Sequence, residues 1–102
     1  MPVVALHVLA LGVDLRIPAA GSLKDKRSVV RTILEGAHRR FRVSAAETGS
    51  ADLHQRAELG FAVVSGSPGQ CTEVIDAVER FVWSFPEIEV VDSDRHWTEV
   101  DR

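Results

Sequence analysis

Residues Ser22–Phe41, SLKDKRSVVRTILEGAHRRF, predict a long amphipathic helix, and the fold follows from its place between strand-like segments. Ser22 carries a side chain suited to an N-cap, and Asp25 follows three residues later, as in a capping box. The apolar side chains recur at spacings of three and four and form one face. They are Leu23, Val30, Ile33, Leu34, Ala37 and Phe41.

Strand patterns flank this helix, and a second helix lies further along the chain. Ser67 as N-cap and Pro68 at the first helical position begin the second helix, which is expected to bury Cys71 and to run to about Phe85. Gly12 is expected to mark a bulge or a twist within the first strand. The four predicted strands are Val3–Ile17, Val43–Thr48, Arg56–Ser65 and Ile88–Thr98.

The predicted order is strand, helix, strand, strand, helix, strand. This order is typical of the ferredoxin-like α+β fold, in which two helices cover one face of a four-stranded antiparallel sheet. Right-handed crossovers place the first and third strands side by side at the centre of the sheet. At 102 residues the chain is expected to form one such domain over residues 1–102.

Composition restricts the class of protein. The hydrophobic share of 45% and the charged share of 26% are typical of a soluble globular chain, and no apolar run reaches the ~18 residues of a membrane span. Cys71 is the only cysteine, which favours a reducing cytoplasm. The four histidines lack the spacing of a metal site, so no metal and no cofactor are expected.

The charge is distributed unevenly along the chain. The net charge is −3, but Ser22–Arg42 alone carries a net +5, and three of its cations crowd the first turn of the predicted helix. Cations there oppose the partial positive charge of a helix N-terminus. A solvated surface, or docking on the chain's own acidic half or on another protein, would also account for such cations, but a one-sided basic stripe suggests phosphate as its partner.

The hypothesis is therefore an RNA-binding protein that reads shape through phosphate contacts. The chain has no tyrosine, and Phe61 falls on the buried face of the third strand, so the sheet offers no ring on which a base could stack. The residues expected to contact RNA phosphates are Lys24, Lys26, Arg27, Arg31 and Arg42, with Gln55 and Arg56 as a second contact zone.

The sheet face away from the helices is expected to be small-residued and apolar, built from Val8, Ala10, Ala62 and Val64. Such a face calls for cover, which a homodimer using the sheet face or its edge would provide. A shift of side-chain parity near Gly12 is the alternative. Trp83 is expected to be partly exposed, either at an interface or folded over Pro86.

No catalytic constellation is apparent, and a non-enzymatic protein is expected. Acylphosphatases share this size and topology, but they orient water with an asparagine, and this chain contains none. The alternative function is a small-molecule-binding regulatory module that holds its ligand at a dimer interface.

Three segments, SLKDKRSVV, DLHQRAELGFAVVS and PEIEVVDSDRHW, occur in an order and spacing that resemble the YlxP-like family. This bacterial family is catalogued chiefly as a domain of unknown function. The resemblance covers nearly the whole chain and implies a ferredoxin-like fold and a cytoplasmic protein. The genes of the family lie among translation and ribosome-maturation factors, which implies a ribosomal RNA or a ribosomal subunit, with the small subunit favoured, as partner. His54 departs from the family pattern, in which tryptophan is frequent.

Overall fold

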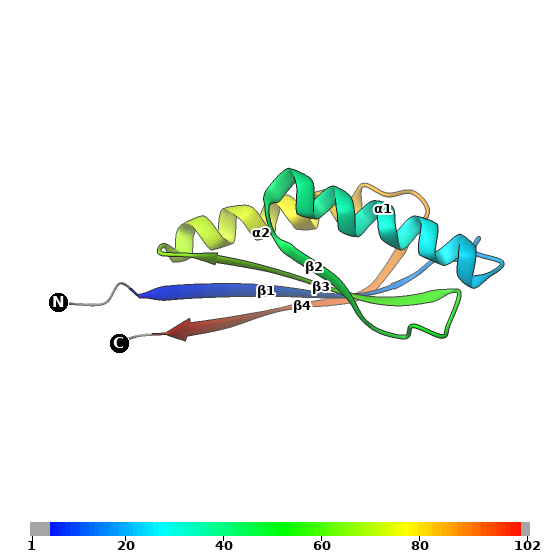
Figure 1. Cartoon of the computed structure of the whole chain (residues 1–102), viewed down its shortest axis with the longest axis horizontal. Coiled ribbons are helices and arrows are strands. Elements are labelled where there is room, and N and C mark those ends of the chain that lie inside the picture. Colours follow the sequence, from blue (N-terminus) through cyan, green and yellow to red (C-terminus); the bar gives the residue numbers. More distant parts are fainter. Residues whose placement is uncertain (1–4, 101–102) are drawn as a thin grey trace.

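The computed structural model describes residues 5–100, which form one sheet covered on one side by two helices (Figure 1). The order β-α-β-β-α-β is that of the predicted ferredoxin-like fold. Both helices lie on the same face of the sheet, and the opposite face is open (Figure 1). The elements are β1 (Leu6–Arg16), α1 (Leu23–Phe41), β2 (Ser44–Gly49), β3 (Arg56–Ser65), α2 (Pro68–Trp83) and β4 (Glu89–Val100).

The sheet has the strand order β2-β3-β1-β4, and its three strand pairs are antiparallel. The two central strands, β1 and β3, are in register from His7 opposite Ser65 to Arg16 opposite Arg56. β2 and β4 are the edge strands. This topology confirms the prediction that the first and third strands lie together at the centre.

Strict alternation along the central strands builds the core. Side chains of β1 and β3 that point toward the helices are buried against the apolar faces of α1 and α2. Cys71, also predicted to be buried, is fully enclosed, with Sγ 3.5 Å from the carbonyl oxygen of His7. The buried strand residues are Leu9, Leu11, Val13, Leu15, Ala57, Leu59 and Phe61.

Both helix starts agree with the predicted caps. The Ser22 hydroxyl accepts a hydrogen bond from the Asp25 N–H at 3.1 Å, and the Ser67 hydroxyl accepts one from the Gln70 N–H at 3.3 Å. The second helix was predicted to run to about Phe85, whereas α2 ends two residues earlier, at Trp83.

The expectation of a bulge or parity shift near Gly12 is wrong. The inward positions of β1 alternate without interruption from Leu9 to Leu15. The irregularity lies two residues further on, where the register with β4 shifts between Asp14 and Leu15. A Cβ at Gly12 would lie 2.7 Å from the Oδ1 atom of Asp94, so a larger residue there would displace the end of that exposed side chain.

Val3, where the first strand was predicted to begin, lies outside the described residues. Within residues 5–100, none of the helices is long and apolar enough to cross a membrane.

Candidate nucleic-acid interface

Lys26, one of the expected phosphate contacts, is buried, and this expectation is corrected. Its side chain is 1% exposed, and Nζ donates a hydrogen bond to the carbonyl oxygen of Ser50 at 2.6 Å. Nζ also lies 2.8 Å from Oε2 of Glu47 in β2. That carboxylate oxygen is itself buried and accepts no hydrogen bond of good geometry, so its contact with Nζ is an ion pair. Lys26 therefore joins α1 to β2 and cannot reach a phosphate in this conformation.

The helical geometry explains why Lys26 differs from its neighbours. At ~100° per residue, Lys26 falls about 40° from Val30, at the centre of the buried face of α1. Glu47 and Ser50, which sequence reasoning missed as its partners, come from a strand and a turn about 20 residues away. The angular position of Lys26 was the one available signal, and it identifies the buried lysine without identifying its partners.

The other four cations expected on the helix form an exposed row along α1 and its C-cap, named here the α1 cation row. Each is exposed, and none of them makes an ion pair or a side-chain hydrogen bond within residues 5–100. The acids of the described residues therefore leave these four charges unpaired. The members of the row are Lys24, Arg27, Arg31 and Arg42.

Arg42 occupies a backbone conformation that favours glycine. It is the C-cap of α1, with φ 56° and ψ 39°, and its N–H donates to the carbonyl oxygen of His38. A left-handed conformation costs a non-glycine residue about 1 kcal/mol. An arginine at this position gives up that stability and adds a cation at the end of the row.

Two further arginines of α1 are engaged by their neighbours. Arg39 lies 3.6 Å from the Glu35 carboxylate, one turn earlier, in a weak exposed pair. Arg40 lies over the ring of Phe81, with its guanidinium carbon 5.0 Å from the ring centroid. Arg40 thereby belongs to the contact between the two helices, on the side away from the α1 cation row.

The structure does not place Gln55 and Arg56 together as a second contact zone. The Gln55 side-chain amide donates to the carbonyl oxygens of Pro18 at 3.2 Å and Ala20 at 3.3 Å, holding the loop before α1. Arg56 donates to both carboxylate oxygens of Asp14, at 3.0 and 2.8 Å, on the open face of the sheet. Arg56 therefore lies on the opposite side of the sheet from α1.

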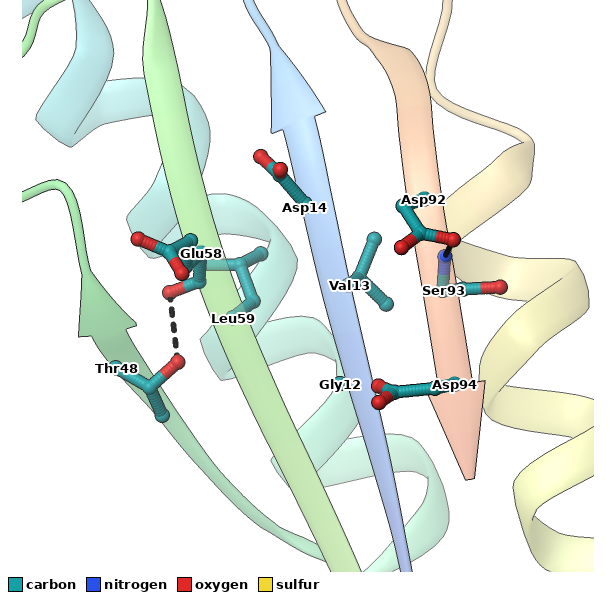
Figure 2. Close-up of a pocket in the computed structure, with 9 residues that line it drawn as sticks. All are labelled: Gly12, Val13, Asp14, Thr48, Glu58, Leu59, Asp92, Ser93 and Asp94. Atoms are coloured by element: carbon teal, nitrogen blue, oxygen red, sulfur yellow. Dashed lines mark hydrogen bonds between the residues drawn. The ribbon is translucent and has the colours of Figure 1, made fainter. Parts of the chain in front are cut away.

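The open face is hollowed. One hollow of about 430 Å³ lies over small residues, which include Ala10, Gly12, Gly60 and Ala62. An adjoining hollow of about 230 Å³ is lined by four carboxylates from three strands: Asp14, Glu58, Asp92 and Asp94 (Figure 2). The expectation of an apolar open face therefore holds where Val8, Ala10, Ala62 and Val64 lie, but it does not hold at this end.

Sequence reasoning missed these carboxylates as a group. The pairing of β1 with β3 and β4 sets Asp14 opposite both Glu58 and Asp92, and sets Asp94 opposite Gly12. Strand alternation predicts the face of each residue, but only the register brings them together. No group of three or more metal-ligating side chains arranged to hold an ion is found within the described part of the chain.

The apolar part of the open face lies at the other end of β1. Val64 is 61% exposed and pairs with Val8, and Ala62 pairs with Ala10. Trp83, at the end of α2, is 43% exposed, as the sequence predicted.

The element order, the strand order and the shared helix face define a ferredoxin-like α+β domain. The chain belongs to the family described as protein of unknown function DUF503, which matches residues 8–95. It is 42% identical over 78 residues to the uncharacterized protein YlxP of Bacillus subtilis (strain 168), across 76% of this chain and 85% of that protein. The resemblance inferred from the sequence is confirmed.

Two solved structures match this chain at low identity and low TM-score. The de novo designed protein Foldit4 is 10% identical, with a TM-score of 0.43, across 93% of this chain and 98% of that chain. The adenosylmethionine decarboxylase from Aquifex aeolicus VF5 is 13% identical, with a TM-score of 0.45, across 96% of this chain and 91% of that chain. Neither likeness bears on what this chain does.

Proposed function

We propose that this protein is a non-enzymatic cytoplasmic factor that binds structured RNA through the α1 cation row. The observation that carries the proposal is the exposure of Lys24, Arg27, Arg31 and Arg42 with no acidic partner in residues 5–100. Exposed cations that are not neutralised within the protein release counterions from a phosphate backbone on binding, and this release drives association.

The distribution of carboxylates favours α1 over the sheet as the RNA-binding surface. Ferredoxin-like RNA readers commonly stack bases on aromatic rings of the open sheet face. Here the open face carries the carboxylates around Gly12, which would repel phosphate. Trp97 of β4 pairs with the inward-facing Leu9 and so belongs to the helix side of the sheet. RNA would accordingly approach from the helix layer and be read by its shape.

The ribosome is the proposed source of the RNA, and the small subunit is the favoured site. This part of the proposal rests on the family resemblance, which implies a gene context among translation and ribosome-maturation factors. The non-enzymatic assignment rests on the residues, because we identify no nucleophile, base and orienting group brought together in residues 5–100.

The test compares two double charge reversals of equal size. Arg27→Glu with Arg31→Glu changes the α1 cation row, whereas Arg16→Glu with Arg80→Glu reverses two exposed arginines of β1 and α2. Binding to a fluorescent RNA hairpin and cosedimentation with ribosomal subunits are measured between about 50 and 200 mM salt, a range over which phosphate contacts weaken steeply.

The first pair is expected to weaken binding by more than about tenfold, and the control pair by less than about threefold. Equal losses of binding for both pairs of substitutions would show that net charge, and not the α1 cation row, accounts for the effect. Absence of binding to hairpin and subunits at the lowest salt would refute the proposal. Melting temperatures of all the proteins establish that each variant is folded.

A second candidate function is small-molecule binding, favoured by the adjoining hollows on the open face. Their carboxylates would select a ligand with a positively charged group, and their small residues would admit an apolar body. A rise in melting temperature with such a ligand, abolished by Glu58→Gln and retained by Glu73→Gln on α2, would support this function. No rise across a panel of amines would exclude it.

A further inference from the structure

His38 lies along the α1 cation row but carries no fixed charge. Its side chain is exposed, as are the four cations of the row. At about 100° per residue, His38 falls about 80° around the helix axis from Val30, and the row falls between about 60° and 120°. Arg31 and Arg42 are about 16 Å apart along this axis at about 1.5 Å per residue. A positive charge on His38 would therefore continue the row between them.

The His38 ring is held through one of its two nitrogens. Nδ1 lies 2.9 Å from the carbonyl oxygen of Val43, in the segment between α1 and β2. A carbonyl oxygen only accepts hydrogen bonds, so the neutral ring carries its proton on Nδ1 and its lone pair on Nε2. The bond to Val43 thus orients the ring and leaves Nε2 as the atom that gains or loses a proton.

The Nε2 atom has room for a partner. It makes no hydrogen bond within residues 5–100. His38 also lines a hollow of about 470 Å³ between α1 and β2. Ala45 is the residue that β2 contributes to this hollow, and it brings no charge. A phosphate oxygen can therefore approach the imidazole from solvent.

The charged side chains around the ring come from α1 and its C-cap. Glu35 and Arg39 line the same hollow and pair with each other at 3.6 Å, and α2 contributes no residue to it. Arg42 follows one turn later and has no acidic partner within the described residues. The carboxylate of Glu47, further along β2, is occupied by Lys26 in the first turn of α1. The surroundings of the ring therefore favour an incoming anion.

We infer that His38 is a further phosphate contact of the α1 cation row and that it acts only in its protonated form. The inference rests on the proposed RNA-binding function and adds a dependence on pH to it. In the neutral ring Nε2 can only accept, and a phosphate oxygen also accepts, so no hydrogen bond forms. Protonation makes Nε2 a donor and gives the ring a positive charge, and both favour phosphate.

The direction of the pH dependence follows from this difference. Histidine is the side chain whose charge ordinarily changes between about pH 5 and 8. Because RNA binds the protonated ring more tightly, affinity rises as the pH falls through this range. By reciprocity, bound RNA increases the fraction of His38 that is protonated at a given pH.

The first test measures fluorescence anisotropy of an RNA hairpin at low salt, at about pH 8 and about pH 5.5. Wild type is expected to bind about threefold or more tightly at the lower pH. His38→Gln should lose this gain. The matched control, His96→Gln, should retain it, because His96 lies beside Asp94 on the open face of the sheet. His38→Arg also removes the ring from Val43, and it should bind tightly at both pH values because its charge is fixed.

The outcomes separate this inference from the function on which it rests. Binding that is independent of pH, or a gain that persists in His38→Gln, would overturn the role of His38 and leave RNA binding by the row intact. Absence of binding at both pH values would refute the proposed function and this inference with it. Melting temperatures at both pH values establish that each variant is folded.

The second test follows the ring nitrogens themselves by ¹⁵N–¹H correlation spectra of the free protein and of the complex. In the free protein at about pH 8, the proton of His38 is expected on Nδ1. On addition of the hairpin near pH 6.5, the protonated fraction of His38 should rise more than that of His96 (a pH of about 6.5 is the middle of the histidine range). A proton on Nε2 in the free protein, or equal changes at the two histidines, would overturn the inference.

Discussion

The Nζ atom of Lys26 lies 2.8 Å from Oε2 of Glu47 and joins the first turn of α1 to the edge strand β2. A second contact, the 2.6 Å hydrogen bond to the carbonyl oxygen of Ser50, fixes the turn that follows β2. Ser50 adopts φ 58°, and its hydroxyl donates to Glu58 on the open face of the sheet at 2.7 Å. One buried lysine thus connects the helix layer to the β2–β3 turn.

Replacing this lysine should destabilise the protein. We expect Lys26→Met to lower the free energy of unfolding by about 2 kcal/mol, because it leaves a buried carboxylate oxygen and a carbonyl without their partner. Lys24→Met, two residues earlier on the exposed side, should change it by less than about 0.5 kcal/mol. Urea unfolding measures both. Equal, small effects would show that the buried pair contributes little.

The contact between Gly12 and Asp94 gives a prediction of compensation. Gly12→Ala should cost less than about 1 kcal/mol, because the new methyl group displaces only the end of the exposed Asp94 side chain from its place over β1. Asp94→Ala alone should cost less, since its pair with His96 is exposed. The double variant should recover most of the loss from Gly12→Ala in thermal or urea unfolding. Strictly additive losses would contradict the contact.

Gly36 of α1 lies against the ring of Phe81 of α2. A Cβ on Gly36 would lie 2.5 Å from Cζ of the Phe81 ring, which packs edge-to-face against Phe41 and Phe85. The ring has neighbours on both sides, so Gly36→Ala should destabilise by about 1 kcal/mol despite the higher helix propensity of alanine.

Gly69 in the first turn of α2 is the matched control for Gly36. A Cβ there meets only the Ser67 hydroxyl at 3.7 Å. Gly69→Ala should therefore leave the free energy of unfolding unchanged or raise it by roughly a few tenths of a kcal/mol. Calorimetric melting compares the two variants, and a stabilising Gly36→Ala would mean that the helices separate easily at this point.

The proposed RNA interface predicts how single substitutions change the salt dependence. Removing one phosphate contact by Arg31→Gln should reduce the slope of log K against log salt by about 0.9 on a duplex. Arg56→Gln should leave the slope unchanged, because Arg56 is held by Asp14 on the opposite face. Fluorescence anisotropy at several salt concentrations measures both, and equal slope changes would contradict the assignment to α1.

Local sequence patterns were sufficient to predict the helices and strands and the order in which they follow one another. Ser22 and Ser67 have the chemistry of helix caps, and both cap a helix. Strand alternation predicted that Phe61 is buried and that Val64 is exposed. These features depend on neighbours within a few residues, so the sequence displays them directly.

The candidate site was predictable only in part. Exposure of Arg27 and Arg31 follows from their angle on the helix, and the structure confirms that exposure. The roles of Lys26 and Arg56 were not predictable from composition, because each is set by a partner distant in sequence: Glu47 for Lys26 and Asp14 for Arg56.

The sequence by itself determined the helix faces, the strand alternation, the family and the concentration of cations in Ser22–Arg42. Only the tertiary structure decided which of those cations stay exposed, and that the carboxylates of three strands gather on the open face. The physical reason is that helix and strand periodicity depend on neighbouring residues. An ion pair or a shared hollow depends instead on the register of the sheet, which brings distant residues within a few ångströms of one another.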